Sequence, residues 1–413
     1  MKKLIHLVSL GLLVFGLIAK VTSAFAAAGS LDPTFGTGGI TMTSSANGFS
    51  LVNAVRIQSD GEILVQVEAP STNEILRYNT NGTLDKGFGT NGIAPVIGGN
   101  MALTEDGQII IGAIVTDPNN SQTAIAVERL NSNGTRDTSF ANGGMALADL
   151  GIHFPVFYVV LAQPDGDILM CASLEPTGRR QPSQTALARF TSSGELDPSF
   201  GSQGMTIATA AGGCTAMALL TNGDILIVDG QAVAQFTSNG SLESTVSGGP
   251  IVASNAGSLP GAANIIEANG DYLLGQDVFT GEESRGHNSA VQVLRFTENG
   301  SPDLTFSNPP FHYVGTGGSG IEALVSGLAA SSNGDVAVVG NQVTFTRNGT
   351  LSVPGLARLT SSGELDPTFG NGGIVVNSVP GSLSVVAVQP ADNKIIAVGF
   401  DNGDLTISRY LAE

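Results

Sequence analysis

The residue types that most often carry catalysis are scarce and scattered in this chain. Beyond residue 28 the sequence has three histidines, His153, His287 and His312, and none has a second histidine at a metal-ligand spacing. Cys171 and Cys214 are not at the spacing of a zinc site either. No nucleophile elbow and no phosphate-binding glycine loop stands between a strand and a helix. The motifs therefore predict no catalytic residue and no metal site.

Carboxylates are the remaining source of chemistry. The chain has 35 Asp and Glu residues, and a glycosidase needs two of them at a fixed separation in space, which the sequence leaves open. The stretches Asn79–Asp85 and Asn131–Asp137 share the pattern Asn-x-Asn-Gly-x-x-Asp, which is similar to a calcium loop. Calcium takes six to eight oxygens, several of them from carboxylates, and each stretch offers one carboxylate. We interpret both stretches as turns and predict no cofactor, with calcium as the alternative.

The charge balance excludes one class of partner. Lys and Arg number 17 against the 35 acids, so the formal net charge is −18. Nucleic-acid binding needs clustered Lys and Arg to neutralise phosphates, and this chain lacks such clusters. Only 13% of residues are charged, while glycine is abundant at 55 residues. This composition is typical of a folded chain with many strands and many turns.

The first residues have the layout of a secretory signal peptide. A positive start, Met1–Lys3, precedes an apolar run, Leu4–Ala19, and Ala24-Phe25-Ala26 fits a cleavage site. We expect a signal peptide over residues 1–28, a single domain over 29–413, and a secreted or periplasmic protein. An N-terminal membrane anchor is the alternative, and no membrane span is expected after removal of the signal.

The cysteines stay ambiguous at this point. In an exported protein Cys171 and Cys214 could form a disulfide. The simpler interpretation is two buried thiols, because both lie in apolar stretches that read as strands.

The strongest signal is an internal repeat. A phrase of the form Gly-x-Leu-Asp-x-x-Phe occurs seven times, one copy being worn. The copies start at Gly29, Gly82, Gly134, Gly194, Gly240, Gly300 and Gly363. A tight turn, usually Asp-Gly or Asn-Gly, also occurs once in each repeat. Apolar runs flank it, as a β-hairpin requires. We count four short strands per unit and predict an all-β, seven-bladed β-propeller with four antiparallel strands per blade. A linear solenoid is the alternative.

The two ends of the chain complement each other. The last unit has three strands, from Val385 to Tyr410, and the segment from Gly29 to about Thr43 resembles the missing fourth. We therefore expect the N-terminal strand to join the last blade and close the ring, which removes two exposed sheet edges.

Five units also pair an arginine with an aspartate eight residues later, and the last unit has the arginine alone. The expected ion pairs are Arg77–Asp85, Arg129–Asp137, Arg189–Asp197, Arg295–Asp303 and Arg358–Asp366, with Arg409 paired to Asp32 by ring closure. The worn fourth unit has Gln235 and Glu243 instead and departs at both positions together. A guanidinium fork suits a carboxylate held by a turn. Because the pair recurs in nearly every unit, we expect it to be structural, with the Phe of the phrase as a plug between blades.

We expect the Asp-Gly turns and the repeat phrases to share one face of the disc, and we expect the binding function on the other face. There the turns and links vary in length, with insertions at residues 116–123, 175–184, 279–289 and 341–354. Loop variation on a fixed scaffold is where binding usually resides. The candidate binding residues are His153, Arg179, Arg180, Glu282, Glu283, Arg285 and His287. Each of them is also readily explained as a solvated or packing residue.

The repeat phrase, the Ala-Arg-Leu type strand before it and the Gln163-Pro-Asp-Gly166 turn resemble the delta-60 repeat. This resemblance implies a bacterial β-propeller and brings no catalytic residue to carry over. We expect a non-catalytic, exported binding or interaction scaffold whose partner is a protein or a glycan. The alternative is a propeller enzyme, a hydrolase or lyase acting on carbohydrate or peptide outside the cytoplasm.

Overall fold

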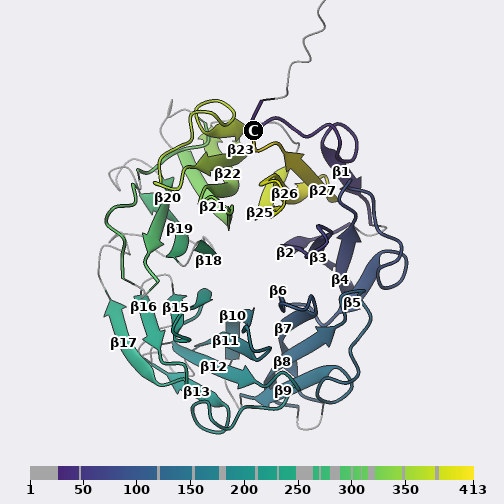
Figure 1. The fold of residues 1–413 in the computed structure, drawn as a ribbon, viewed down its shortest axis with the longest axis vertical. Helices are drawn as coiled ribbons and strands as arrows, with labels where there is room; N and C mark the ends of the chain where they lie inside the picture. Colours follow the sequence, from purple (N-terminus) through teal and green to yellow (C-terminus); the bar gives the residue numbers. More distant parts are fainter. Residues whose placement is uncertain are drawn as a thin grey trace, which may run out of the picture.

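The computed structural model describes most of the chain beyond residue 26. The described residues are 27–45, 48–118, 121–150, 154–175, 183–209, 213–229, 232–247, 264–268, 271–279, 289–298, 301–307, 309–314, 321–346, 349–376 and 381–413. They form 27 β-strands, which Figure 1 shows as sheets arranged radially around a central space. Within these ranges no helix has the length and apolarity to cross a membrane. The predicted signal peptide, residues 1–28, lies almost wholly outside them.

Five of the sheets have four strands each. The first blade contains β2 (Leu51–Ile57), β3 (Ile63–Ala69), β4 (Thr72–Tyr78) and β5 (Ile93–Val96). The second contains β6 (Asn100–Leu103), β7 (Ile109–Thr116), β8 (Thr123–Leu130) and β9 (Met145–Asp149). The third contains β10 (Phe154–Ala162), β11 (Ile168–Glu175), β12 (Gln184–Phe190) and β13 (Met205–Ala208). The fourth contains β14 (Ala216–Leu219), β15 (Ile225–Asp229), β16 (Ala232–Phe236) and β17 (Leu242–Ser247). The sixth contains β25 (Ser382–Val388), β26 (Ile395–Asp401), β27 (Asp404–Tyr410) and β1 (Ile40–Thr43).

The fifth blade is a single sheet of seven strands. They are β18 (Asn264–Ala268), β19 (Asp271–Phe279), β20 (Ser289–Phe296), β21 (Ile321–Ala330), β22 (Val336–Thr346), β23 (Gly349–Leu359) and β24 (Ile374–Val376). The parallel pair Ser289–Glu322 joins β20 to β21. The all-β propeller is confirmed, but the expected count of seven four-stranded blades is wrong: seven sequence units form six blades.

The joining of two sequence units into one seven-stranded sheet has a local cause. The fifth unit would need a fourth strand beside β20, but Pro309 and Pro310 supply no backbone N–H for a ladder. Pairing there shrinks to one isolated bridge between Val291 and Phe311. The edge of β20 therefore takes its remaining pair from β21 of the next unit.

The ends of the chain close the ring. β1 runs antiparallel to β27, and Thr41 is the register partner of Ile407. In Figure 1 the purple start of the described chain accordingly lies beside its yellow end. The N-terminal strand thus supplies the fourth strand of the sixth blade, as the sequence predicts.

The core lies between neighbouring blades. Five phenylalanines of the repeat phrase are completely buried, namely Phe35, Phe88, Phe140, Phe200 and Phe369. The glycine that opens the next phrase makes room for such a ring: a Cβ on Gly134 would lie 2.7 Å from the ring of Phe88, and Gly134 also has a positive φ of 82°. Gly and Phe of successive phrases therefore lock adjacent blades together.

The two cysteines are joined across blades. Cys171, on β11 of the third blade, forms a disulfide with Cys214, which precedes β14 of the fourth blade. The interpretation as two buried thiols is wrong for this structure. Both residues are completely buried, so the bond lies within the packing between these blades.

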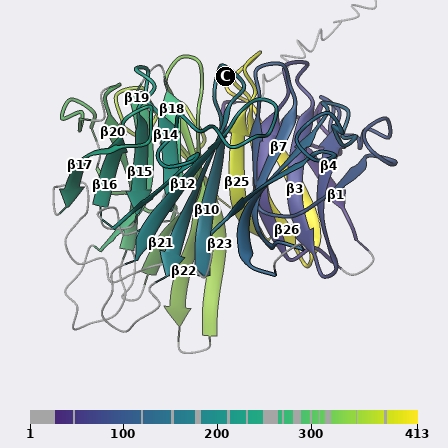
Figure 2. The same ribbon diagram turned by 90° about the horizontal axis from the view of Figure 1, so that it is seen from below.

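Each inner strand runs from one face of the disc to the other. We call the face with the Asp-Gly and Asn-Gly turns and the repeat phrases the turn face, and the other the variable face. On the variable face, the predicted insertion at residues 341–354 is a regular extension of the β22–β23 hairpin, with register pairs from Asn341–Pro354 to Thr346–Gly349. Figure 2 shows this hairpin projecting beyond the other strands.

Candidate functional site

The turn face carries the six expected ion pairs. In each pair the arginine Nε donates a hydrogen bond of 2.7–2.9 Å to an aspartate Oδ2. The pairs are Arg77–Asp85, Arg129–Asp137, Arg189–Asp197, Arg295–Asp303, Arg358–Asp366 and Arg409–Asp32. Each guanidinium also lies 4.4–4.8 Å from the centroid of a phrase phenylalanine ring, within range of a cation–π interaction.

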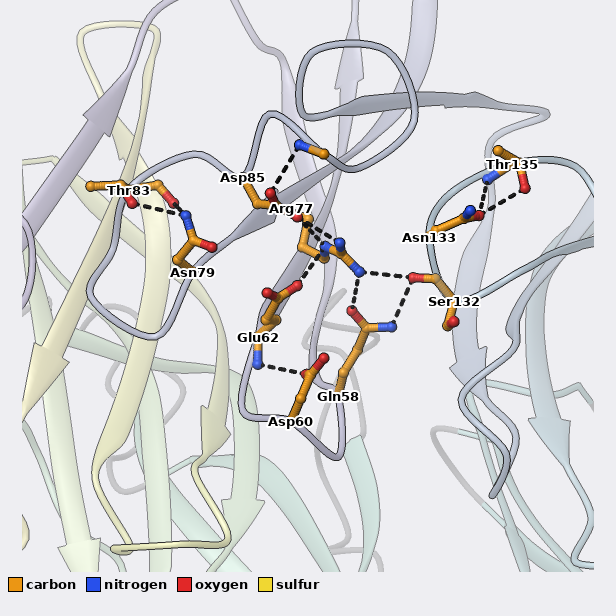
Figure 3. Close-up of polar contacts among 11 residues, drawn as sticks. Gln58, Asp60, Glu62, Arg77, Asn79, Thr83, Asp85, Ser132, Asn133 and Thr135 are labelled. Carbon is orange, nitrogen blue, oxygen red and sulfur yellow. Dashed lines mark hydrogen bonds and ion pairs between the residues drawn. The ribbon is translucent and has the colours of Figure 1, made fainter.

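The arginines also tie neighbouring units together. Figure 3 shows this for Arg77, whose Nη1 donates a 3.0 Å hydrogen bond to the carbonyl oxygen of Ser132 in the second blade. Arg129, Arg189, Arg295, Arg358 and Arg409 donate in the same way to a carbonyl of the following unit. With carboxylate, carbonyl and ring all occupied by the protein itself, these clusters are architecture.

The electrostatics of the aspartates agree with that role. Hydrogen bonds from the side chain and backbone of Thr305 hold the pKa of Asp303 at about 2, and Arg295 adds to the shift. At Asp32 burial favours the neutral acid, but Thr34, Lys394 and Arg409 outweigh it and also hold the pKa at about 2. Both carboxylates are therefore charged at neutral pH and bound by permanent partners.

The fourth unit lacks this cluster. Gln235 donates a 3.2 Å hydrogen bond to Asp224 instead, and Glu243 is exposed. β15 to β17 remain antiparallel neighbours without the pair, but the register between β16 and β17 shifts between Gln235 and Phe236.

The candidate binding residues of the variable face fall outside the described residues. These are His153, Arg179, Arg180, Glu282, Glu283, Arg285 and His287. His312 is described and partly buried, and burial lowers the pKa of its imidazole.

The stretches that are similar to calcium loops are turns in the structure. Asn81 Oδ1 accepts a 3.0 Å hydrogen bond from the Thr83 backbone N–H, and Asp85 Oδ1 accepts a 2.9 Å bond from Gly87 N–H. Asp85 Oδ2 already binds Arg77, as Figure 3 shows. Across the described part of the chain, no three His, Cys, Asp or Glu side chains are grouped as metal ligands.

A hollow lies at the centre of the ring. A cavity of about 620 Å³ is lined by β2, β10, β14, β21 and β25, together with Asn100 and Asn341. Its lining includes Leu51, Asn100 and Ser382, the first residues of β2, β6 and β25, so the cavity reaches the variable face. A smaller pocket of about 230 Å³ lies on the turn face around Arg358 and Asp366, which bind each other.

Five polar residues from different units line this cavity at one level. In each of these units, a hydrogen bond to a backbone carbonyl oxygen closes the hairpin between the two innermost strands, as Gly61 N–H to Gln58 does in the first unit. Each of the five polar residues stands five positions before the residue that supplies this carbonyl oxygen. They are Asn53, Tyr158, Thr215, Ser326 and Ser384, which we call the polar collar. At Asn53, Ser326 and Ser384 the register shifts by a β-bulge. Bulges are known to redirect side chains next to binding sites, and here they occur where polar residues meet the cavity.

One charged side chain lies in the described lining. Arg56 stands three residues beyond Asn53 on β2, roughly 10 Å farther along the strand. Its Nη1 donates a 2.9 Å hydrogen bond to the carbonyl oxygen of Val55, and no carboxylate among the described residues pairs with it. The side chain is accessible from the cavity, yet protein surrounds that cavity, and the lost hydration lowers the pKa of the guanidinium. Arginine nevertheless keeps its charge in proteins.

The sequence motifs missed Arg56, but a comparison between units reveals it. The other six units have an apolar residue at the same distance from the turn: Ala102, Leu161, Ala218, Ile265, Ala329 and Ala387. A charge at an inner-strand position that is otherwise apolar is therefore the signal.

Several solved structures resemble this one at low sequence identity. Solved structures that resemble this one include an α-L-arabinofuranosidase of Fusarium graminearum in complex with arabinobiose (12% identity, 90% of this chain and 96% of that chain covered, TM-score 0.46). Others are an α-L-arabinanase of Penicillium chrysogenum (11%, 93% and 97%, 0.43) and a protein of unknown function from Bacteroides caccae (15%, 82% and 98%, 0.36). At these TM-scores and identities they carry no argument.

The sequence comparisons are sparser. No curated protein matches the chain. A family model described as a domain of unknown function (DUF5122) beta-propeller matches residues 58–88, 104–140, 163–200 and 332–369. The narrower resemblance to the delta-60 repeat stays a prediction. The four matched segments lie within units of the internal repeat and support a β-propeller repeat in this chain.

Proposed function

We propose that this protein is an exported, non-catalytic binding scaffold that takes a small hydroxyl-bearing ligand, such as a glycan end, into its central cavity from the variable face. The observation that carries the proposal is the polar collar. Five residues whose side chains can hydrogen-bond line one cavity of about 620 Å³, which is within the usual size range of ligand pockets. Two of these side chains also bind the protein: Asn53 Nδ2 donates to Glu68 Oε1, and Thr215 Oγ1 donates to the carbonyl oxygen of Val228.

The charge content of the lining favours binding over catalysis. Glycoside cleavage uses a pair of carboxylates that flank the scissile bond. The described lining has one charged side chain, and it is the guanidinium of Arg56. The hydroxyl and amide groups of the polar collar suit sugar hydroxyl groups, which both donate and accept hydrogen bonds.

The proposal is tested by filling the cavity. Ser384→Phe places a ring at the collar, while Ser59→Phe places the same ring on an exposed position beside a turn-face hairpin. Isothermal titration against a panel of neutral and acidic oligosaccharides should give binding by the wild type and by Ser59→Phe, and none by Ser384→Phe. New reducing ends or unsaturated sugar products in the same mixtures, or full binding by Ser384→Phe, would contradict it.

A further inference from the structure

We infer that Arg56 is the anion-binding end of the central cavity, and that the ligand is a polyhydroxylated molecule with one carboxylate, such as a uronic or aldonic acid. This inference rests on the proposed function, because it places the acid group of the same ligand. It adds a charge requirement that a purely hydroxyl-binding cavity does not have.

The first argument is the isolation of the guanidinium. The seven other described arginines each have a carboxylate within 4.0 Å; six use the aspartates of the turn face, and Arg136 uses Glu128. In a chain with 35 acids and 17 bases, a described arginine without such a partner is unexpected. Arg56 has five N–H donors, and its one described hydrogen bond is to the Val55 carbonyl oxygen. The remaining donors are available to a ligand.

The second argument is location. A surface arginine without a partner is well hydrated, and its isolation has no consequence. Arg56 is exposed, but it lines a cavity that the inner strands of the ring surround, and this enclosure lowers the pKa of its guanidinium. A group that must keep its charge in such a place gains most from an anion, and a planar guanidinium binds a carboxylate with two parallel hydrogen bonds.

The third argument is the spacing of the two polar features. The collar and Arg56 are separated by three residues of β2, about 10 Å. The lining between and around them is apolar, with Ala54, Val55, Val159 and Leu328 among its residues. A ligand that reaches both therefore has a hydroxyl-rich body at the collar and its acid group near the turn face.

The test uses pairs of probes that differ in one group. These are D-galacturonate with D-galactose, D-glucuronate with D-glucose, and D-gluconate with D-glucitol, titrated into the mature chain at low ionic strength. At least one acid should bind tenfold or more tightly than its neutral partner. Arg56→Met should reduce its affinity to that of the neutral partner, while Arg56→Lys keeps part of the preference because it keeps the charge.

Lys86→Met is the matched control, since it removes one positive charge from an exposed position of the turn face. It should leave every affinity unchanged. The inference is overturned if acid and neutral probes bind equally to the wild type, or if the preference survives in Arg56→Met.

The outcomes also separate the two proposals. Neutral probes that bind and are blocked by Ser384→Phe, with no preference for acids, overturn the inference and leave the proposed function standing. The absence of binding by every probe and by the oligosaccharide panel overturns both. If Arg56→Met fails to fold, the decision falls to Arg56→Lys, in which an acid preference equal to that of the wild type would contradict bidentate binding.

Discussion

Arg409 and Asp32 are 377 residues apart in sequence, and Arg409 Nε donates a 2.9 Å hydrogen bond to Asp32 Oδ2. The pair has the same geometry as the five pairs formed within single units. It connects the last strand to the start of the described chain, so the repeat pattern continues across the closure. The ring is therefore held shut by the same cluster that orders each unit.

We expect the closing pair to be strongly coupled. The side chains of Arg409 and Asp32 are 7% and 2% exposed, and breaking a buried pair costs about 3–5 kcal/mol because a charge is left without its partner. Urea unfolding of Arg409→Met, Asp32→Asn and the double variant should give a coupling free energy of about 1–3 kcal/mol. Strictly additive losses would show that the two side chains act independently.

The fourth unit offers the reverse experiment. Gln235→Arg with Glu243→Asp restores the residue types of the other units at the same eight-residue spacing. The double variant should be more stable than the wild type by about 1 kcal/mol, the usual scale of a partly exposed ion pair. Glu243→Asp alone should give no gain, because it adds no cation. Gln235→Arg alone should gain less than the double variant, because the carboxylates it can reach are those of Asp224 and Glu243 and not an aspartate at the eight-residue spacing. Equal unfolding midpoints for all four proteins would refute the pairing rule.

Asp277 makes a pH-dependent contribution to stability whose sign is opposite to that of Asp32 and Asp303, because its pKa is raised and theirs are lowered. Burial raises its pKa to about 6, against the 2.8 Å hydrogen bond from Val325 N–H and with help from the charge of Glu322, while its Oδ2 has no described donor. The raised pKa favours the protonated acid in the folded state. This contribution is complete below about pH 4 and is lost as the pH rises through 6.

Asp277→Asn removes the buried charge and keeps an acceptor for Val325. Thermal unfolding should therefore show it more stable than the wild type at pH 8, with the difference shrinking towards pH 4. Asp60→Asn, at an exposed turn, is the control and should follow the wild type. A difference that does not change with pH would contradict the burial of an ionised carboxylate.

The disulfide should stabilise the junction between the third and fourth blades. Cys171 and Cys214 are 43 residues apart, and a cross-link of this span typically contributes about 2–4 kcal/mol. Reductant should lower the unfolding temperature of the wild type and leave that of Cys171→Ala with Cys214→Ala unchanged. An equal response of both proteins to reductant would argue against the bond.

Much of the fold could be predicted because its signals are local. The eight-residue Arg–Asp spacing and the Asp-Gly turns recur in the sequence itself, and ring closure follows from a last unit that lacks one strand. The blade count failed because the fifth unit is interrupted by Pro309 and Pro310, whose effect depends on what lies beside β20. The disulfide required knowledge of which blades are adjacent.

The candidate site was harder to predict. Motif searches look for residues at a fixed spacing along the chain, whereas the collar takes one residue from each of five units, such as Asn53 and Ser384. Such a ring is visible only when the units are aligned on their turns. Arg56 was missed for the same reason, since it is unusual only relative to the apolar residues of the other units.

The central claim is that the turn face is architecture and the central cavity is the binding site. Its most direct test is to measure the unfolding temperature and the affinity for the best acidic probe in both Arg189→Met and Arg56→Met. We predict that Arg189→Met unfolds at a lower temperature with unchanged affinity, while Arg56→Met loses affinity at a nearly unchanged unfolding temperature. The reverse pattern, or both effects in both variants, would contradict the account.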